Sequence, residues 1–257
     1  MSDVNRRGLV AGSGAIYASA IEFSLCRLLV LIAIPLTLGA QGNNQAGTWD
    51  TEDKRILGIF TNHRTTDESM NRTKLTPGGK FDIAWHDATD RAIFVQSAIL
   101  SGIGQATNGN PSYGQGIGGY AKRFGSTYAD FAIQNMMTEA IFPTILHQDP
   151  RYFRRRNGTG RSRLGYAVSR LFITRTDSGK QQFNFSEVVG GATFLAISNS
   201  YHPDGRGVPD NTSRYATQLC FDAASNVLKE FWPDLRRKLR GRQGPRSLVS
   251  PDYAVSR

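Results

Sequence analysis

The sequence predicts a mainly α-helical protein, a helical bundle built on a long antiparallel helix hairpin. Apolar side chains recur every three or four residues along several long stretches, which is the period of one helix face. Clusters of turn-forming residues separate these stretches. Alternation of apolar and polar residues, which marks a half-buried strand, is limited to two short runs at 56–60 and 183–185. With 257 residues and 39% hydrophobic content, the chain is long enough for one sizeable core.

Residues 1–40 have the three-part layout of a secretory signal peptide. Arg6 and Arg7 form a basic start, and an apolar run begins at Leu28. That run is shorter than the roughly 20 residues that a membrane-spanning helix needs, and the small residues up to Ala40 suit cleavage there. We therefore expect an exported protein, located in the periplasm or associated with the outer membrane. An uncleaved N-terminal anchor is the alternative.

The rest of the chain divides into a leader, one domain and a tail. Residues 41–75 are rich in Asn, Thr, Gly and Asp, which predicts a flexible leader with one short extended segment. Residues 76–240 carry the helical patterns of a single domain, and the polar, basic residues 241–257 predict a disordered tail. Cleavage after Ala40 removes Cys26, so we expect Cys220 to be a buried, unpaired thiol.

Two long helical patterns form the predicted hairpin. The first begins at Thr76 and Pro77, a capping residue followed by proline at the first helical position. Its apolar face comprises Phe81, Trp85, Ala88, Ala92, Val95, Ile99 and Ile103. Turn residues at 108–111 end it, and the second pattern runs over 112–142, where Pro143 is expected to kink or end the helix. A short turn between two long helices favours antiparallel packing.

Further helices are predicted towards the C-terminus, at 164–173, 186–201 and 212–239. Asn184, followed three residues later by Glu187, predicts a capping box at the start of the second of these. Trp232 and Pro233 predict an interruption in the third.

Glycines are frequent inside the second helical pattern. Gly114 and Gly118 have the spacing that lets two helix backbones approach closely, in lipid or in a soluble bundle. We expect these glycines to support close packing, including assembly into a homo-oligomer. Gly114, Gly116 and Gly119 also match the dinucleotide-binding pattern, but no buried strand precedes them, so no cofactor is predicted.

Asp82, His86 and Asp90 recur every four residues along the first helical pattern. Two acids that flank a histidine could bind a metal or tune a general base. The competing interpretation is a solvated helix face, since three ligands on one helix cannot enclose a metal without a second element. We therefore predict no bound metal and keep these three residues as the candidate ligands.

Glu139, His147 and Asp149 bracket Pro143 in the densest polar and aromatic cluster of the chain. Glu139 and His147 could form a general acid–base pair, with Arg151 holding an anionic substrate. The alternative is structural, with His147 and Asp149 capping the end of a helix.

Arginines concentrate between residues 151 and 175, where no acidic residue occurs. The guanidinium fork binds phosphate groups through two parallel hydrogen bonds, so the expected partners are anionic lipid or an envelope polymer. Export makes nucleic acid the least available partner. A solvated basic surface that serves solubility is the alternative. The candidate anion-binding residues are Arg151, Arg154, Arg155, Arg156, Arg161 and Arg163.

The segment HQDPRYFRR resembles a family of exported bacterial proteins with no assigned activity. The upstream GYAKRFGSTYADFAIQNMMTEAIFP, the downstream ITRTDSGKQQFNFSE and the closing LKEFWPDLRRKL are similar to the same family, over about Lys54 to Leu239. The resemblance implies an exported bacterial origin, and it transfers no catalytic or binding residue.

These patterns predict an exported, non-enzymatic cell-envelope protein that binds an anionic membrane or envelope polymer through its arginine-rich segment. Two alternatives stay open. One is an envelope hydrolase or transferase that acts on a phosphorylated lipid or glycan, with Glu139, His147 and Arg151 in its site. The other is a periplasmic scaffold that binds another protein.

Overall fold

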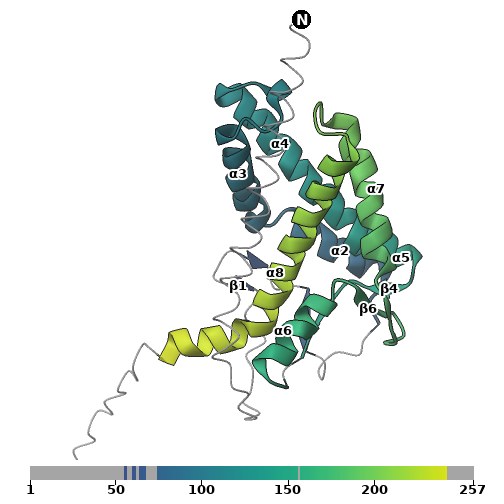
Figure 1. Cartoon of the computed structure of the whole chain (residues 1–257). Coiled ribbons are helices and arrows are strands. Elements are labelled where there is room, and N and C mark those ends of the chain that lie inside the picture. The colour runs from purple at the N-terminus through teal and green to yellow at the C-terminus, as the bar shows by residue number, and fades with distance from the viewer. Residues whose placement is uncertain (1–54, 57–59, 62–63, 68–73, 156, 242–257) are drawn as a thin grey trace, which may run out of the picture.

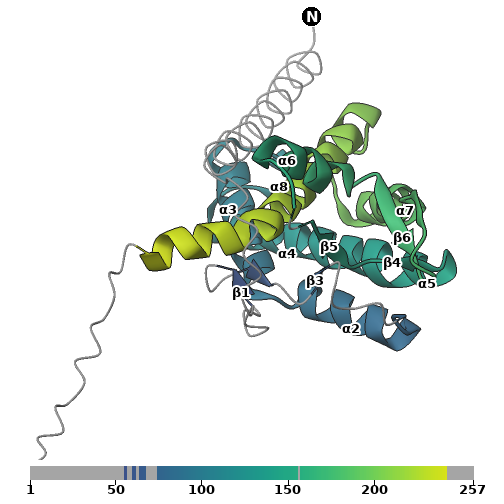
Figure 2. The same ribbon diagram turned by 90° about the horizontal axis from the view of Figure 1, so that it is seen from below.

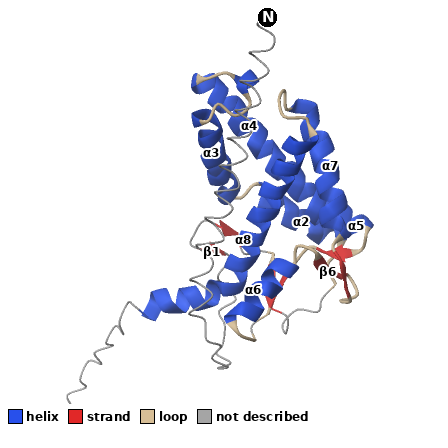
Figure 3. Cartoon of the chain, viewed as in Figure 1, coloured by secondary structure: helices blue, strands red, loops and turns tan. Residues whose placement is uncertain are grey.

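The computed structural model describes residues 55–56, 60–61, 64–67, 74–155 and 157–241 (Figure 1). Within these ranges the chain is mainly helical, which confirms the predicted fold class (Figure 3). The predicted signal peptide, Arg156 and the tail beyond residue 241 lie outside the described residues.

The described elements follow one another along the chain, and most of them are helices. The helices are α2 (Pro77–Ala88), α3 (Arg91–Ala106), the 3₁₀ turn η1 (Pro111–Tyr113), α4 (Gly116–Asn135), the π-helix η2 (Met136–Ile141), α5 (Phe142–Ile145), α6 (Gly160–Ser169), α7 (Phe185–Tyr201) and α8 (Val208–Gly241). The strands are β1 (Arg55–Ile56), β2 (Phe60–Thr61), β3 (Thr65–Asp67), β4 (Gln148–Asp149), β5 (Tyr152–Arg154), β6 (Ile173–Thr176) and β7 (Gln181–Phe183).

The long helix α8 connects the two ends of the domain (Figures 1 and 2). Helix α6 and strand β5 pack against it, and α7 contacts it as well. Helix α3 packs on α4, and η2 contacts both α2 and α7. A hydrophobic cluster where α6, β5 and α8 meet contains Tyr152, Ala167, Val227 and Phe231.

The first predicted helix is in fact two helices, because α2 ends at Ala88 and α3 begins at Arg91. Thr76 caps α2 as expected, since its hydroxyl accepts a hydrogen bond from the Gly79 N–H at 3.2 Å. Asp90 caps α3 in the same way, with Oδ1 2.8 Å from the nitrogen of Ala92. A short acid that accepts N-terminal N–H groups starts a new helix, although the apolar period continues across the break.

A buried arginine fixes the turn between α3 and α4. Arg123 donates to the carbonyls of Gly109, Asn110 and Gly114 and to the side-chain oxygen of Gln105. Gly114 lies in this turn with φ of 75°, before the start of α4. Its predicted role in a contact between two helix backbones is therefore wrong.

Close helix contacts are made instead at Gly190 and Gly191 of α7. A Cβ atom on Gly190 would lie 3.2 Å from the carbonyl carbon of Met137 in η2, and one on Gly191 would lie 2.3 Å from Cε2 of Tyr215 in α8. Only glycine lets α7 approach both neighbours this closely.

The second predicted helix widens before Pro143. Helix α4 passes into the π-helix η2, and Pro143 is the second residue of α5, which ends at Ile145. Proline cannot donate to the carbonyl four residues earlier and its ring clashes there, so a wider π turn relieves both problems. The π turn carries Glu139, which is buried.

Part of the segment that the sequence predicts as a flexible leader is folded. Strand β3 runs parallel to β5, with Thr65 beside Tyr152 and Thr66 beside Phe153. Strands β4, β6 and β7 form a small antiparallel sheet. Strands β4 and β5 are buried along their whole length, so they show no alternation of buried and exposed residues.

Helix α8 continues through Trp232 and Pro233, where the sequence predicts an interruption. Cys220 on this helix is disulfide-bonded, so the predicted unpaired thiol is wrong. The sequence holds one other cysteine, Cys26, which lies outside the described residues.

Candidate functional site

Polar side chains fill much of the interior, and many large apolar side chains lie outside. On α3, Ser97 and Ser101 are buried, while Phe94 and Ile99 are exposed. Trp85 of α2 is 61% exposed, although it belongs to the apolar face that the sequence predicts. Exposed apolar side chains of this size are typical of surfaces that contact lipid or another protein.

The interior of the described structure holds charges of both signs, whereas the exposed charges are nearly all basic. Among the residues whose exposure the structure describes, Asp82 is the exposed acid, and the other aspartates and glutamates are buried or half-buried. The exposed bases in the same ranges are Lys74, Arg91, Lys122, Arg155, Arg161, Lys180, Arg206, Arg237 and Lys238. The outer surface is therefore strongly basic, because the fold places its acids inside.

Hydrogen bonds and ion pairs hold several of these interior acids. Asp130 of α4 accepts a hydrogen bond from the Ser198 hydroxyl at 2.7 Å and pairs with Nε2 of His202 at 2.9 Å. Lys80, which is buried in α2, lies 2.8 Å from Asp177. Acids that are partnered in this way add little negative potential to the surface.

A buried charge cluster surrounds Glu139 in the π-helix. Arg64, next to β3, forms an ion pair with Oε1 of Glu139. Burial raises the pKa of Glu139 to about 8, although Arg64 acts against this shift, and Asp87 of α2 reinforces it. The other carboxylate oxygen, Oε2, has no hydrogen-bond partner in the described part of the chain.

Glu187 of α7 and Asp222 and Lys229 of α8 belong to the same cluster. Burial raises the pKa of Glu187 to about 8, with repulsion from Asp222 adding to the effect and Arg64 opposing it. Burial also raises the pKa of Asp222 and lowers that of Lys229 to about 8. Asn184 caps α7 at the Glu187 N–H, as predicted, but Oε1 of Glu187 has no partner among the described residues.

The structure does not bring Glu139 and His147 together. His147 is exposed after α5 with φ of 54°, and its carbonyl accepts the N–H of Asp177 at 2.9 Å. Asp149 is buried and binds Arg151 through both carboxylate oxygens, at 2.9 and 2.6 Å. The guanidinium of Arg151 is thus engaged by an acid of its own chain.

The three candidate metal ligands also do not converge. Asp82 and His86 are exposed on α2, with Nδ1 of His86 3.3 Å from Oδ1 of Asp82. Asp90 is buried at the start of α3, where it acts as the cap. Within the ranges that the structure describes, no group of three His, Cys, Asp or Glu side chains is placed to hold a metal ion.

The candidate anion-binding arginines differ in exposure. Arg163 is buried, with Nε 2.9 Å from Oε1 of Glu230 and Nη1 2.6 Å from Oδ2 of Asp234. Arg154 is also buried and donates to the carbonyl of Lys229 at 2.8 Å. The acids that partner Arg163 lie on α8, 67 and 71 residues away in the sequence. The sequence around Arg163 therefore could not indicate that its guanidinium is paired.

Arg155 and Arg161 are the exposed members of this set in the described part of the chain. The guanidinium carbon of Arg155 lies 5.8 Å from the centre of the Tyr166 ring. Arg156 is outside the described residues. Among the described arginines of this segment, Arg155 and Arg161 are therefore the exposed cations that could meet an external anion.

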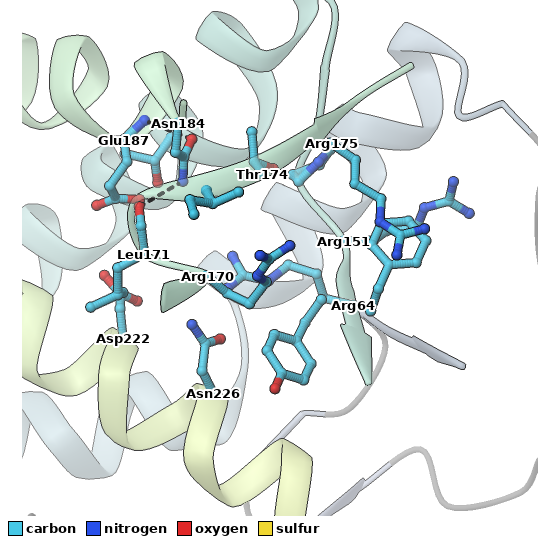
Figure 4. Close-up of a pocket in the computed structure, with 15 residues that line it drawn as sticks. Arg64, Arg151, Arg170, Leu171, Thr174, Arg175, Asn184, Glu187, Asp222 and Asn226 are labelled. Atoms are coloured by element: carbon cyan, nitrogen blue, oxygen red, sulfur yellow. Dashed lines mark hydrogen bonds between the residues drawn. The ribbon is translucent and has the colours of Figure 1, made fainter. Parts of the chain in front are cut away.

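A pocket with a volume of about 60 Å³ lies between β5, β6, α7 and α8 (Figure 4). Glu187, Asp222 and Asn226 lie at one end of it, and arginines extend across it (Figure 4). No sequence motif marks this pocket, because its lining comes from segments that are far apart in the chain. The arginines that line it are Arg64, Arg151, Arg170 and Arg175.

Comparisons of the chain with protein-family models, with curated proteins and with solved structures found no match. Among the described residues, no helix combines the length and the apolar character needed to cross a membrane. Function is therefore inferred from the charge distribution, the exposed apolar side chains and the pocket.

Proposed function

We propose that the protein is an exported, non-enzymatic cell-envelope protein that binds an anionic membrane surface through exposed basic side chains. The observation that carries the proposal is the charge of the exposed surface, where the described charged side chains are basic except for Asp82. Near an anionic membrane each exposed lysine or arginine contributes about 1 kcal/mol of attraction. Interior acids that are already paired do not repel such a surface.

The arginine-rich segment contributes to this surface through Arg155 and Arg161. Arg151 and Arg163 are engaged by acids of the chain and are not assigned to the membrane contact. Exposed bases from other elements, such as Lys122 of α4, extend the basic surface beyond the segment.

Exposed apolar side chains favour lipid over a soluble polymer as the partner. Phe81 and Trp85 of α2 and Phe94 of α3 are exposed. Lys74 precedes α2 and Arg91 is the first residue of α3, and both are exposed. Aromatic rings enter the headgroup layer while neighbouring bases pair with lipid phosphates, whereas a soluble anionic polymer offers no apolar phase.

The finer architecture belongs to this proposal. We infer that α3 and α4 act as the arms of an antiparallel hairpin in a bundle, and that a basic tail follows α8. Val95 and Ile99 on α3 are exposed and would contact lipid or a second copy of the chain. Assembly into a homo-oligomer on the membrane would bury this face.

Co-sedimentation with lipid vesicles tests the proposal. We expect binding to vesicles that contain phosphatidylglycerol, little binding to pure phosphatidylcholine, and a loss of binding as salt is raised. The double variant Arg155→Gln/Arg161→Gln removes two surface charges and should weaken binding roughly ten- to thirtyfold. Asp82→Asn is the matched control, because it removes the exposed acid and should leave binding equal or stronger.

Two results would contradict membrane binding by charge. One is equal binding to anionic and neutral vesicles, and the other is binding that salt does not weaken. Binding to an anionic envelope polymer without binding to vesicles would reassign the partner to the polymer.

A further inference from the structure

The pocket in Figure 4 contains buried hydrogen-bond donors for which the described residues provide no acceptor. Nε of Arg64 and Nε of Arg170 are both buried, and neither has a hydrogen-bond partner in the described part of the chain. Both residues line the pocket. A buried guanidinium N–H without an acceptor is costly, so a pocket with two of them suits an incoming ligand that supplies oxygen acceptors.

Two neutral donors in the same pocket, on Thr174 and Asn184, already have acceptors. The hydroxyl of Thr174 donates to the carbonyl of Asp149 at 3.0 Å, and the amide of Asn184 donates to the carbonyl of Leu171 at 3.1 Å. The arginines therefore dominate the chemistry that the pocket offers to a ligand. Guanidinium groups are well suited to the oxygens of phosphate.

Two carboxyl groups, Glu187 and Asp222, lie in the pocket and reduce its positive charge only in part. Burial raises the pKa of both, that of Glu187 to about 8, so near neutral pH Glu187 is largely protonated and its O–H is a donor. The charged groups that act on Glu187 are Arg64 and Asp222. Tyr215 of α8 also reaches it, since its hydroxyl donates to the Glu187 carbonyl at 3.3 Å.

We propose that this pocket binds a phosphoryl oxyanion, supplied as inorganic phosphate or as the phosphomonoester head group of a lipid, with Arg64 and Arg170 as its anchors. The pocket volume of about 60 Å³ gives room for a small group of this kind. The site goes beyond membrane-surface binding and uses buried rather than exposed bases, so either proposal can fail without the other.

Calorimetric titration of the full chain with inorganic phosphate tests the site. Arg170→Gln is the chosen variant, because the Arg170 guanidinium lies over the Tyr166 ring, at 4.5 Å, and not in a buried ion pair. We expect it to weaken phosphate binding about tenfold or more, the usual effect of losing a charged hydrogen bond. Arg161→Gln, exposed and outside the pocket lining, is the matched control and should leave the affinity unchanged.

The site is overturned if the wild-type chain shows no saturable phosphate binding, or if Arg170→Gln binds phosphate as the wild type does. Circular dichroism of both variants confirms that each is folded. Arg64→Gln is a second variant with the same expected loss, although it also breaks the ion pair with Glu139.

Vesicles distinguish the two sources of the phosphoryl group. Phosphatidic acid presents a phosphomonoester, whereas phosphatidylglycerol presents a diester. If phosphatidic acid vesicles displace bound phosphate more strongly than phosphatidylglycerol vesicles do, the lipid head group is an occupant. If neither displaces it, the occupant is free phosphate, and both results support the site. The variant Arg155→Gln/Arg161→Gln should lose vesicle adsorption but keep phosphate binding, which separates this site from the membrane surface.

Sulfate is the probe for pH dependence, because its charge stays constant across the range tested. Ionisation of Glu187 adds a negative charge to the pocket, so sulfate affinity should fall as the pH rises through about 8. In Glu187→Gln this fall should be smaller, and the part that remains is expected from Glu139 and Lys229, whose pKa values are also about 8. If sulfate affinity falls with pH as much in Glu187→Gln as in the wild type, Glu187 does not contribute to the pH dependence of the site.

Discussion

Arg163 and Glu230 form a buried ion pair, with Nε 2.9 Å from Oε1, although 67 residues separate them in the sequence. Glu230 is fully buried and also accepts hydrogen bonds from the hydroxyl of Tyr152 and the N–H of Arg155. Through this one carboxylate, α8 is joined to both α6 and β5. Arg163, which the sequence places in the basic cluster, thus stabilises the packing of α6 on α8 inside the fold.

Glu230→Gln should destabilise the protein strongly. The variant leaves the buried Arg163 without its fully buried carboxylate partner, and breaking one side of a buried ion pair costs about 3–5 kcal/mol. Asp234→Asn removes the second partner of Arg163, but Asp234 is 24% exposed, so a smaller loss is expected there. Urea denaturation of the two variants measures both free energies of unfolding. Equal losses would show that burial does not set the strength of these pairs.

The same pair shows which part of the site the sequence could predict. Composition located the arginine cluster, but the exposed Arg155 and the buried Arg163 have the same local sequence character. Their difference arises from acids on α8, and only the folded chain brings these acids to α6. Arg64 carried no signal, and the spacing that marked Glu187 as a capping residue did not place it in the pocket. The ion pair of Arg64 with Glu139 and the repulsion between Glu187 and Asp222 both depend on contacts between distant segments.

Helices were the predictable part of the fold because their signals are local. Asn184 capped α7 as its spacing indicates, and Thr76 started α2. Asp90 was missed as a helix start because an apolar period ran across it. Strand β3 was missed because its residues are polar and pair only through the backbone with β5, which follows much later in the chain.

Glu187 should make the stability depend on pH. Its pKa is about 8 in the folded chain against an ordinary value of 4.5. Between these values the folded protein keeps a proton that the unfolded chain has released, so the free energy of unfolding falls as the pH rises from about 4.5 to about 8. Above about pH 8 both states have lost the proton and this contribution is constant.

Glu187→Gln should reduce the loss of stability between about pH 4.5 and pH 8. At about pH 8 the variant lacks a buried unpaired carboxylate, so it should be more stable than the wild type by about 1–3 kcal/mol, whereas near pH 4 the two should be equal. Glu139 and Asp222 have pKa values shifted in the same direction, so some decline remains. Urea denaturation at several pH values measures the difference. Identical pH profiles for the two proteins would contradict the burial of an ionisable Glu187.

Two glycine substitutions should act in opposite directions. Gly191→Ala places a Cβ 2.3 Å from the Tyr215 ring, and the forced shift of α7 or α8 should cost about 1–3 kcal/mol. Gly125→Ala, exposed in α4 with open space around its Cβ, should stabilise by about 0.5–1 kcal/mol, because alanine favours the helix. Thermal unfolding of both variants gives the comparison. A stable Gly191→Ala would show that α7 and α8 can separate without loss.

Export and the disulfide at Cys220 make a linked prediction about the N-terminus. The export proposal predicts a mature chain that begins at Gln41, and such a chain contains Cys220 but not Cys26. A disulfide within one chain needs both cysteines, so it excludes removal of residues 1–40. N-terminal sequencing of the protein recovered from the cell envelope, together with thiol alkylation without reductant, separates the two cases. If the mature chain begins at Gln41, Cys220 should either be alkylated or form an intermolecular disulfide, in a dimer that reductant dissociates. A retained N-terminus whose cysteines resist alkylation would instead show that the first 40 residues stay attached as an anchor.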